Sequence, residues 1–315
     1  MQSALRICRA IVAVTLMALS IALFDVGAAL AQAPQSKFAE VNGVKLHYLI
    51  AGEGDPVVLL HGYAETSHMW LPLISKLADR HTVIAPDLRG FGQSSAPDAG
   101  YTKKAMAQDV HALMRSLHYD RIRLVGHDIG LMVAYAYAAQ YPDVVDRLVL
   151  MEAFLPGVGD WNSVFLLRDL WHFHFYGKTP LALVTGRERI YLEHFWNDFA
   201  ADPAKSVPEE DREFYTKAYA EPGHMKAGME VFRAFPKDAE DFAQFAKVRR
   251  ARRSQLLSHL FQCARNRHRH RPGVRDGCLQ LLYRPHHVYR QCREGLAQDR
   301  LVRGAVHGIL SDAAQ

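Results

Sequence analysis

Short apolar runs alternate with longer stretches of helical pattern through the first half of the chain. The helical stretches include residues 103–117 and the alanine-rich residues 131–140. The apolar runs have the length and composition of buried strands and occupy residues 44–49, 56–60, 82–85, 122–125 and 147–151. Strands that alternate with helices predict an α/β fold with a mostly parallel, doubly wound sheet.

The pattern changes between residues 156 and 247, where helical charge patterns dominate and no clear sheet is predicted. Large aromatic residues gather in this stretch, namely Trp161, Trp171, Phe173, Phe175, Trp196 and Phe199. We therefore expect a separate helical unit after the alternating region.

A tight turn follows the fourth predicted strand, with the sequence Gly126-His127-Asp128-Ile129-Gly130. Small residues around a strained central residue are typical of an elbow that holds one side chain up at a sheet edge. The central Asp128 is a nucleophile that can open an epoxide or a carbon–halogen bond and form an ester. Hydrolysis of that ester needs a histidine base, an acid and an oxyanion hole. The alternatives are an inactive elbow or a chance occurrence of the pattern.

Three segments resemble the α/β-hydrolase fold, and within it the epoxide hydrolases and dehalogenases that use an aspartate nucleophile. They are the elbow around Asp128, the segment His61-Gly62-Tyr63 and residues 87–94, in the usual order and spacing. The resemblance is greatest to a secreted, Cif-like branch of epoxide hydrolases. It implies no metal and no organic cofactor.

The same resemblance assigns parts and roles. Residues 36–155 match the N-terminal part of the hydrolase core, and residues 156–247 match the helical cap of the family. Asp128 matches the nucleophile, and the backbone N–H groups of Tyr63 and Ile129 match the oxyanion hole.

Two further roles follow from the Cif-like branch. Glu152, after the last predicted strand, matches the acid of the catalytic triad, the alternative being a solvated glutamate. His172 matches a cap histidine that donates a proton to the epoxide oxygen, the alternative being a packed histidine. The usual second donor is a tyrosine, but Phe232 occupies its place. One-donor opening would be slower, unless a nearby tyrosine substitutes, the candidates being Tyr191, Tyr215 and Tyr219.

The residue after the nucleophile separates substrate classes within the resembling group. Haloalkane dehalogenases have a tryptophan there and haloacetate dehalogenases an arginine, whereas this chain has Ile129. The resemblance therefore implies a small, neutral, apolar epoxide and water as substrates. Haloalkane or haloacetate dehalogenation by the same nucleophile is the runner-up. No oligomeric state is predicted.

The amino terminus has the pattern of a secretory signal peptide over residues 1–31. Arg6 and Arg9 precede an apolar run at residues 11–24, and a small-x-small cleavage site follows at residues 29–31. The run is short for a membrane span, so we expect export to a periplasm or beyond and no stable membrane span after cleavage. An uncleaved anchor is the alternative. The lack of cysteine in residues 32–247 suits export.

The last part of the chain differs in composition from the rest. Residues 36–250 contain 24 basic and 28 acidic residues, whereas residues 251–315 contain 12 arginines, no lysine and four acids. Residues 248–315 thus form an anomalous Arg-, His- and Cys-rich tail where the family has its last core strands. Three interpretations remain: a shift of the reading frame, which leads, a basic nucleic-acid-binding extension, and a metal site. The leading interpretation, a shift of the reading frame, implies no nucleic-acid partner.

The tail also lacks the usual sequence around the catalytic base. No Val/Ile-rich strand follows residue 247, and His307 lies in a poor imitation of the glycine–histidine–aromatic signature. The base is therefore unknown, and the C-terminal part of the core is predicted to be missing or disordered. We expect alkylation of Asp128 without turnover, or a catalytically dead relic.

Overall fold

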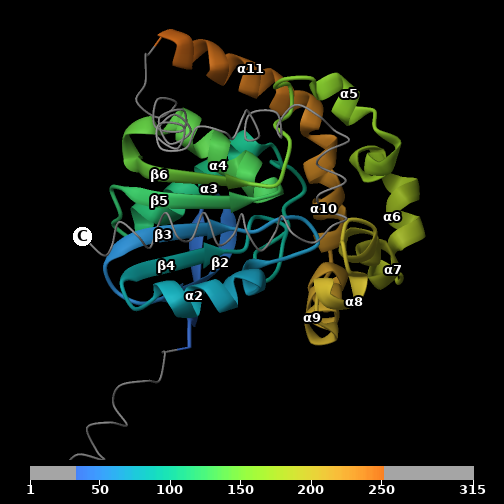
Figure 1. Ribbon diagram of the computed structural model, residues 1–315, viewed down its shortest axis with the longest axis horizontal. Helices are drawn as coiled ribbons and strands as arrows, with labels where there is room; N and C mark the ends of the chain where they lie inside the picture. The colour runs from blue at the N-terminus through green and yellow to red at the C-terminus, as the bar shows by residue number, and fades with distance from the viewer. Residues whose placement is uncertain (1–32, 252–315) are drawn as a thin grey trace, which may run out of the picture.

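The structure, a computed structural model, describes residues 33–251, so the predicted signal peptide and the tail from residue 252 lie outside the described residues. Within that range six strands form one sheet in the order β1-β2-β4-β3-β5-β6 (Figure 1). The strands are β1 (Gln35–Val41), β2 (Val44–Ala51), β3 (Asp55–Leu60), β4 (His81–Pro86), β5 (Ile122–His127) and β6 (Val145–Met151).

The pairing confirms the predicted α/β class and its mostly parallel sheet. β4, β3, β5 and β6 run parallel to one another, whereas β1 and β2 pair antiparallel at one end of the sheet. The five predicted strands correspond to β2 through β6. β1 was not predicted, because most of its side chains are exposed and it contains no apolar run.

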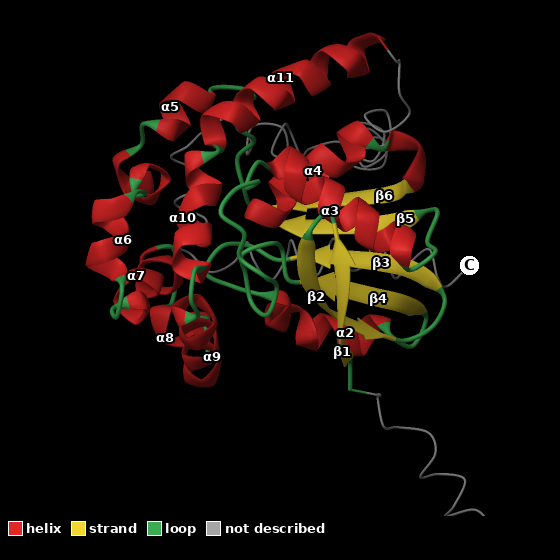
Figure 2. Cartoon of the chain, turned by 180° about the vertical axis from the view of Figure 1, so that it is seen from behind, coloured by secondary structure: helices red, strands yellow, loops and turns green. Residues whose placement is uncertain are grey.

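Helices cover both faces of the sheet (Figure 2). α3 (Lys103–Ser116) and α4 (Ile129–Gln140) pack on one face, and η1 (Ser67–Trp70) with α2 (Leu71–Leu77) covers the other. Alternate residues of a strand point to opposite faces. Val58 and Leu60 of β3 therefore belong to the core under α3 and α4, and the adjacent positions of β3 belong to the core under α2.

After β6 the described chain forms helices and loops without a further strand. The short helix η2 (Pro142–Val144) precedes β6. The later elements lie beside one end of the sheet, except the last helix, which runs back past β6 and α4 (Figure 1). They are α5 (Trp161–Phe165), η3 (Arg168–His174), α6 (Lys178–Val184), α7 (Glu188–Glu193), η4 (His194–Asp198), α8 (Pro203–Ser206), α9 (Glu209–Ala220), α10 (His224–Arg233) and α11 (Phe235–Ala251). These helices occupy the stretch in which the sequence predicts a helical cap, and we call them the cap.

A buried ion pair ties the cap to the core. Lys103 Nζ at the start of α3 lies 2.9 Å from Asp238 Oδ2 of α11, and both side chains are fully buried. The backbone N–H of Lys103 also donates to Asp238 Oδ1 at 2.8 Å. Burial lowers the pKa of Lys103 and raises that of Asp238, while their mutual attraction opposes both shifts. Each charge therefore depends on its partner.

Candidate active site

Asp128 lies in a strained turn between β5 and α4, as the elbow pattern predicts. Its φ of 48° and ψ of −118° are rare for a residue with a side chain. Both flanking positions must be glycine, because there is no room for a side chain. A Cβ on Gly126 would overlap the carbonyl of Gly130, and one on Gly130 would overlap the carbonyl of Leu60. The backbone N–H of Asp128 donates to the carbonyl of Met151 at 3.0 Å, which holds the elbow beside β6.

The two predicted oxyanion-hole amides both bind the Asp128 carboxylate. The backbone N–H of Tyr63 donates to Asp128 Oδ2 at 2.8 Å, and the backbone N–H of Ile129 bonds to the same carboxyl group. Ile129 is also the first residue of α4, where the helix dipole favours negative charge. These groups can stabilise the carboxylate and later an oxyanion on the same carboxyl carbon.

The segment around His61 shapes the loop that carries Tyr63. His61 is fully buried, and burial lowers its pKa, so the ring is neutral. Its Nδ1 lies 2.8 Å from the carbonyl of Gly62 and must donate, while its Nε2 accepts from the N–H of Leu88 at 3.0 Å. His61 therefore ties the Gly62–Tyr63 peptide to the backbone at Leu88.

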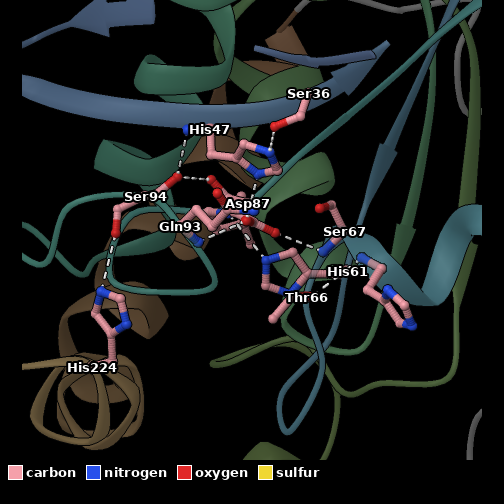
Figure 3. Close-up of polar contacts among 11 residues, drawn as sticks. Ser36, His47, His61, Thr66, Ser67, Asp87, Gln93, Ser94 and His224 are labelled. Atoms are coloured by element: carbon pink, nitrogen blue, oxygen red, sulfur yellow. Dashed lines mark hydrogen bonds and ion pairs between the residues drawn. The ribbon is translucent and has the colours of Figure 1, made fainter. Parts of the chain in front are cut away.

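Asp87 connects this loop to β2 and to residues 87–94 (Figure 3). Its carboxylate accepts from the backbone N–H groups of Ser67 at 2.7 Å and Gln93 at 2.9 Å, and lies 2.7 Å from His47 Nδ1. Burial alone would raise the pKa of Asp87, but the bonds from His47 and the backbone bring it below its usual value. Asp87 therefore acts as a charged anchor for two loops.

His127 and Glu65 form an ion pair beside Asp128. His127 Nδ1 lies 3.2 Å from Glu65 Oε2. Burial lowers the pKa of His127, but Glu65, Asp128 and Glu152 raise it to about 9, so the ring is cationic at neutral pH. Burial raises the pKa of Asp128, and the His127 charge followed by the two amides opposes that rise. Glu65 was not predicted, although it lies in the same loop as Tyr63.

Glu152 lies where the sequence places it, directly after β6. Its φ of 54° is positive, and its side chain is exposed. Within residues 33–251 its carboxylate has no side-chain hydrogen bond, but its charge acts on His127 in the elbow. The histidine that it would orient is not identified among the described residues, so its place in a triad stays a prediction.

His172 lies on the cap side of the site and is 5% exposed. Burial, followed by the neighbouring His194 and His174, lowers the pKa of His172 to about 3, so the ring is neutral. Its ring centroid lies 4.8 Å from that of Phe195 and 5.3 Å from that of Phe232. Both phenylalanines also contact Tyr63, at 4.8 and 4.5 Å between centroids. One aromatic cluster thus joins His172 to the residue whose amide binds Asp128.

The three tyrosines named as substitute donors lie in different places. Tyr191 accepts a hydrogen bond from Tyr63 Oη at 3.4 Å, and Tyr219 packs its ring 5.7 Å from that of Tyr63. Tyr215 instead contacts His68 and Trp196. Of the three tyrosines, Tyr191 therefore has the most direct hydroxyl connection to Tyr63.

Over residues 33–251 no group of three or more His, Cys, Asp or Glu side chains is placed to hold a metal ion. In the same range no helix is both long and apolar enough to cross a membrane.

The family model of the α/β-hydrolase fold matches residues 55–246. The chain is 35% identical over 214 residues to a soluble epoxide hydrolase of Corynebacterium sp. strain C12, covering 65% of this chain and 74% of that protein. It is 31% identical over 210 residues to a fluoroacetate dehalogenase of Burkholderia sp., covering 64% and 69%. The solved epoxide hydrolase CorEH has a TM-score of 0.63 at 34% identity, covering 67% of this chain and 77% of that chain.

The chain therefore belongs to the α/β-hydrolase family. Epoxide hydrolases and a fluoroacetate dehalogenase are among its homologues.

Proposed function

We propose that this protein is an exported epoxide hydrolase that opens a small, neutral, apolar epoxide to a vicinal diol. The observation that carries the proposal is the Asp128 carboxylate, held in a strained elbow and bonded by the amides of Tyr63 and Ile129. An epoxide hydrolase relative at 35% identity supports the same chemistry.

The first step is attack of Asp128 on an epoxide carbon. The carbon–oxygen ester bond forms as the ring carbon–oxygen bond breaks, and the ring oxygen takes a proton from His172. In the second step water adds to the ester carbonyl, and the amides of Tyr63 and Ile129 stabilise the oxyanion. Collapse of the oxyanion breaks the ester bond, releases the diol and restores the Asp128 carboxylate. A histidine base, oriented by Glu152, would activate that water.

The environment of the site favours a neutral substrate. His172 is neutral and lies in the same aromatic cluster as Phe195 and Phe232. Such a surface binds apolar groups and offers one hydrogen-bond donor for an epoxide oxygen.

The second candidate is dehalogenation by the same nucleophile, favoured by the 31% identity to a fluoroacetate dehalogenase. A dehalogenase releases halide into solution, whereas an epoxide hydrolase does not. Halide measured during incubation with fluoroacetate or a chloroalkane therefore separates the two candidates.

Intact mass of the full chain after incubation with an aryl epoxide tests the proposal. We expect a mass increase of one substrate on the wild-type chain and none on Asp128→Asn. Absence of both adduct and diol in the wild-type chain would contradict epoxide opening. The remaining interpretation would then be a catalytically dead member of the fold. An adduct that persists matches the predicted lack of a base, whereas sustained diol release would overturn that expectation.

Resequencing the coding DNA from codon 240 to the stop tests the tail. Another frame that encodes a Val/Ile-rich strand and a glycine–histidine–aromatic segment would support the frame shift. Confirmation of the present frame would make the tail genuine. N-terminal sequencing of the protein recovered from outside the cytoplasm tests export, with cleavage expected after residue 31.

A further inference from the structure

Two cap residues beyond the predicted site lie in line behind His172. His172 Nδ1 is 3.1 Å from His194 Nε2, and His194 Nδ1 is 2.6 Å from Asp198 Oδ2. His172 comes from η3, while His194 and Asp198 are the two ends of η4, a π-helical turn. Such turns are rare and frequent at functional sites.

The three side chains lead from the buried site to the surface. His172 is 5% exposed, the side chain of His194 is 9% exposed, and that of Asp198 is 66% exposed. The hydrogen bond of His172 to His194 uses Nδ1, and Nε2 of His172 has no hydrogen-bond partner within residues 33–251. An exposed ion pair at a turn adds little to stability, so the line has no evident structural purpose.

The protonation state of His194 decides which nitrogen of His172 carries the proton. His194 Nδ1 faces a carboxylate and must donate to it. If His194 is neutral, its Nε2 can only accept, so His172 is protonated at Nδ1 and its Nε2 cannot donate. If His194 is protonated, its Nε2–H donates to His172 Nδ1, and His172 then carries its proton at Nε2.

We propose that His194 and Asp198 are positioning residues that hold His172 in its donor tautomer and resupply its proton during ring opening. This inference rests on the proposed function. During attack by Asp128, the ring oxygen takes the Nε2 proton of His172. The Nε2 proton of His194 then moves to His172 Nδ1. His172 stays neutral, and His194 is left neutral beside Asp198.

Few other titratable groups act on this line among the described residues. His174, on the same element as His172, lowers the pKa of His172 but bonds the carbonyl of Phe165 instead. The rings around His194, namely Trp171, Phe195 and Phe199, carry no charge. Asp198 is the acid bonded to His194.

Transfer of a proton from His194 to His172, which we call the relay, would compensate for the absence of a tyrosine donor at position 232. Phe232 contacts His172 at 5.3 Å but cannot donate a proton. A donor that receives its proton from a cationic neighbour is a stronger acid in the transition state. Ring opening with a single donor therefore depends on His194.

The test is the rate of adduct formation on Asp128, measured by quenched intact mass from about pH 5.5 to about pH 8, where histidines titrate. In the full wild-type chain, the relay predicts a rate that falls toward alkaline pH, because the epoxide oxygen then has no relayed proton to take. His194→Phe keeps the aromatic packing, and we expect it to lose the alkaline fall and to react roughly tenfold more slowly in acid. Asp198→Asn should lie between the two.

His174→Gln is the matched control, because it removes a neighbouring histidine without touching the line, and it should keep the wild-type profile. A His194→Phe chain with the wild-type rate and pH profile would overturn the relay. Displacement of halide needs no proton on the leaving group, so an adduct from a chloroalkane should show no alkaline fall.

Nitrogen-15 NMR of the histidine side chains separates this inference from the proposed function. We expect the His172 signals, assigned with His172→Phe, to change from the Nε2–H to the Nδ1–H tautomer with rising pH, and to lose this change in His194→Phe. A tautomer that ignores both pH and His194 would overturn the relay, even in a chain that forms adduct. If the tautomer changes with pH but no adduct forms, the coupling of His194 to His172 would stand and the proposed epoxide hydrolase activity would be contradicted.

Discussion

The two sides of the candidate site are built differently. On the nucleophile side, Asp128 is bound by the amides of Tyr63 and Ile129, which are backbone groups of two short motifs. On the cap side, His172 and His194 meet across two separate helices. Local backbone geometry therefore builds the first side, whereas packing between distant elements builds the second.

The two sides of the site also differ in their electric charge. The nucleophile side is charged, with the cationic His127 next to Asp128 and Glu65. The cap side at His172 is neutral and aromatic, because burial makes a charged ring there costly. In the proposed reaction the Asp128 carboxylate would attack and the neutral His172 would donate the proton, which suits a neutral ring as substrate.

The largest expected effect comes from the nucleophile. Asp128→Asn should slow adduct formation by at least about 10³-fold, because an amide oxygen is a poor nucleophile. Asparagine tolerates the positive φ of this position better than other residues, so the fold should persist by circular dichroism. An adduct at the wild-type rate would place the reactive group elsewhere.

The next largest effect concerns the buried ion pair between Lys103 and Asp238, which joins the cap to the core. Asp238→Ala leaves Lys103 buried without its partner and should cost about 3–5 kcal/mol of unfolding free energy, measured by urea denaturation. The double variant Lys103→Met/Asp238→Leu is the control and should recover most of the loss. A single variant that stays within about 1 kcal/mol of wild type would show that the pair does not join cap to core.

The cap side should matter less than the nucleophile. His172→Phe removes the donor while keeping an aromatic ring, and adduct formation should slow by about 10²-fold. Binding of a non-reactive apolar analogue should change little, because the surrounding phenylalanines remain. An unchanged rate would show that His172 is only a packed histidine of the cap.

The smallest effect concerns the pair beside Asp128. His127 has a raised folded pKa, so its stabilisation is full below the unfolded value of 6.5 and is lost as pH rises through about 9. Both side chains are about one-fifth exposed, so the amount is below about 1 kcal/mol. Proton NMR should show the pKa of His127 falling in Glu65→Gln, because the Glu65 carboxylate is the neighbour that raises it most. A titration unchanged by Glu65→Gln would exclude the pair as its cause.

Much of the sheet and of the nucleophile side could be predicted from the chain. The predicted strand at residues 122–125 corresponds to β5, and the helix predicted at residues 131–140 begins two residues earlier in the structure. Buried parallel strands are continuous apolar runs, which makes them visible. β1 was missed because an exposed edge strand has no such run.

The sequence by itself determined the class of fold and the position of Asp128, because a strained elbow needs glycines at fixed spacing on both sides. Only the tertiary structure decided that Glu65 pairs with His127, and that His194 and Asp198 lie behind His172. The contacts of Glu65 with His127 and of His172 with His194 join residues from different loops and helices, whose separation along the chain carries no periodic signal. Side-chain networks of this kind are fixed by packing, which a pattern of apolar and polar residues does not specify.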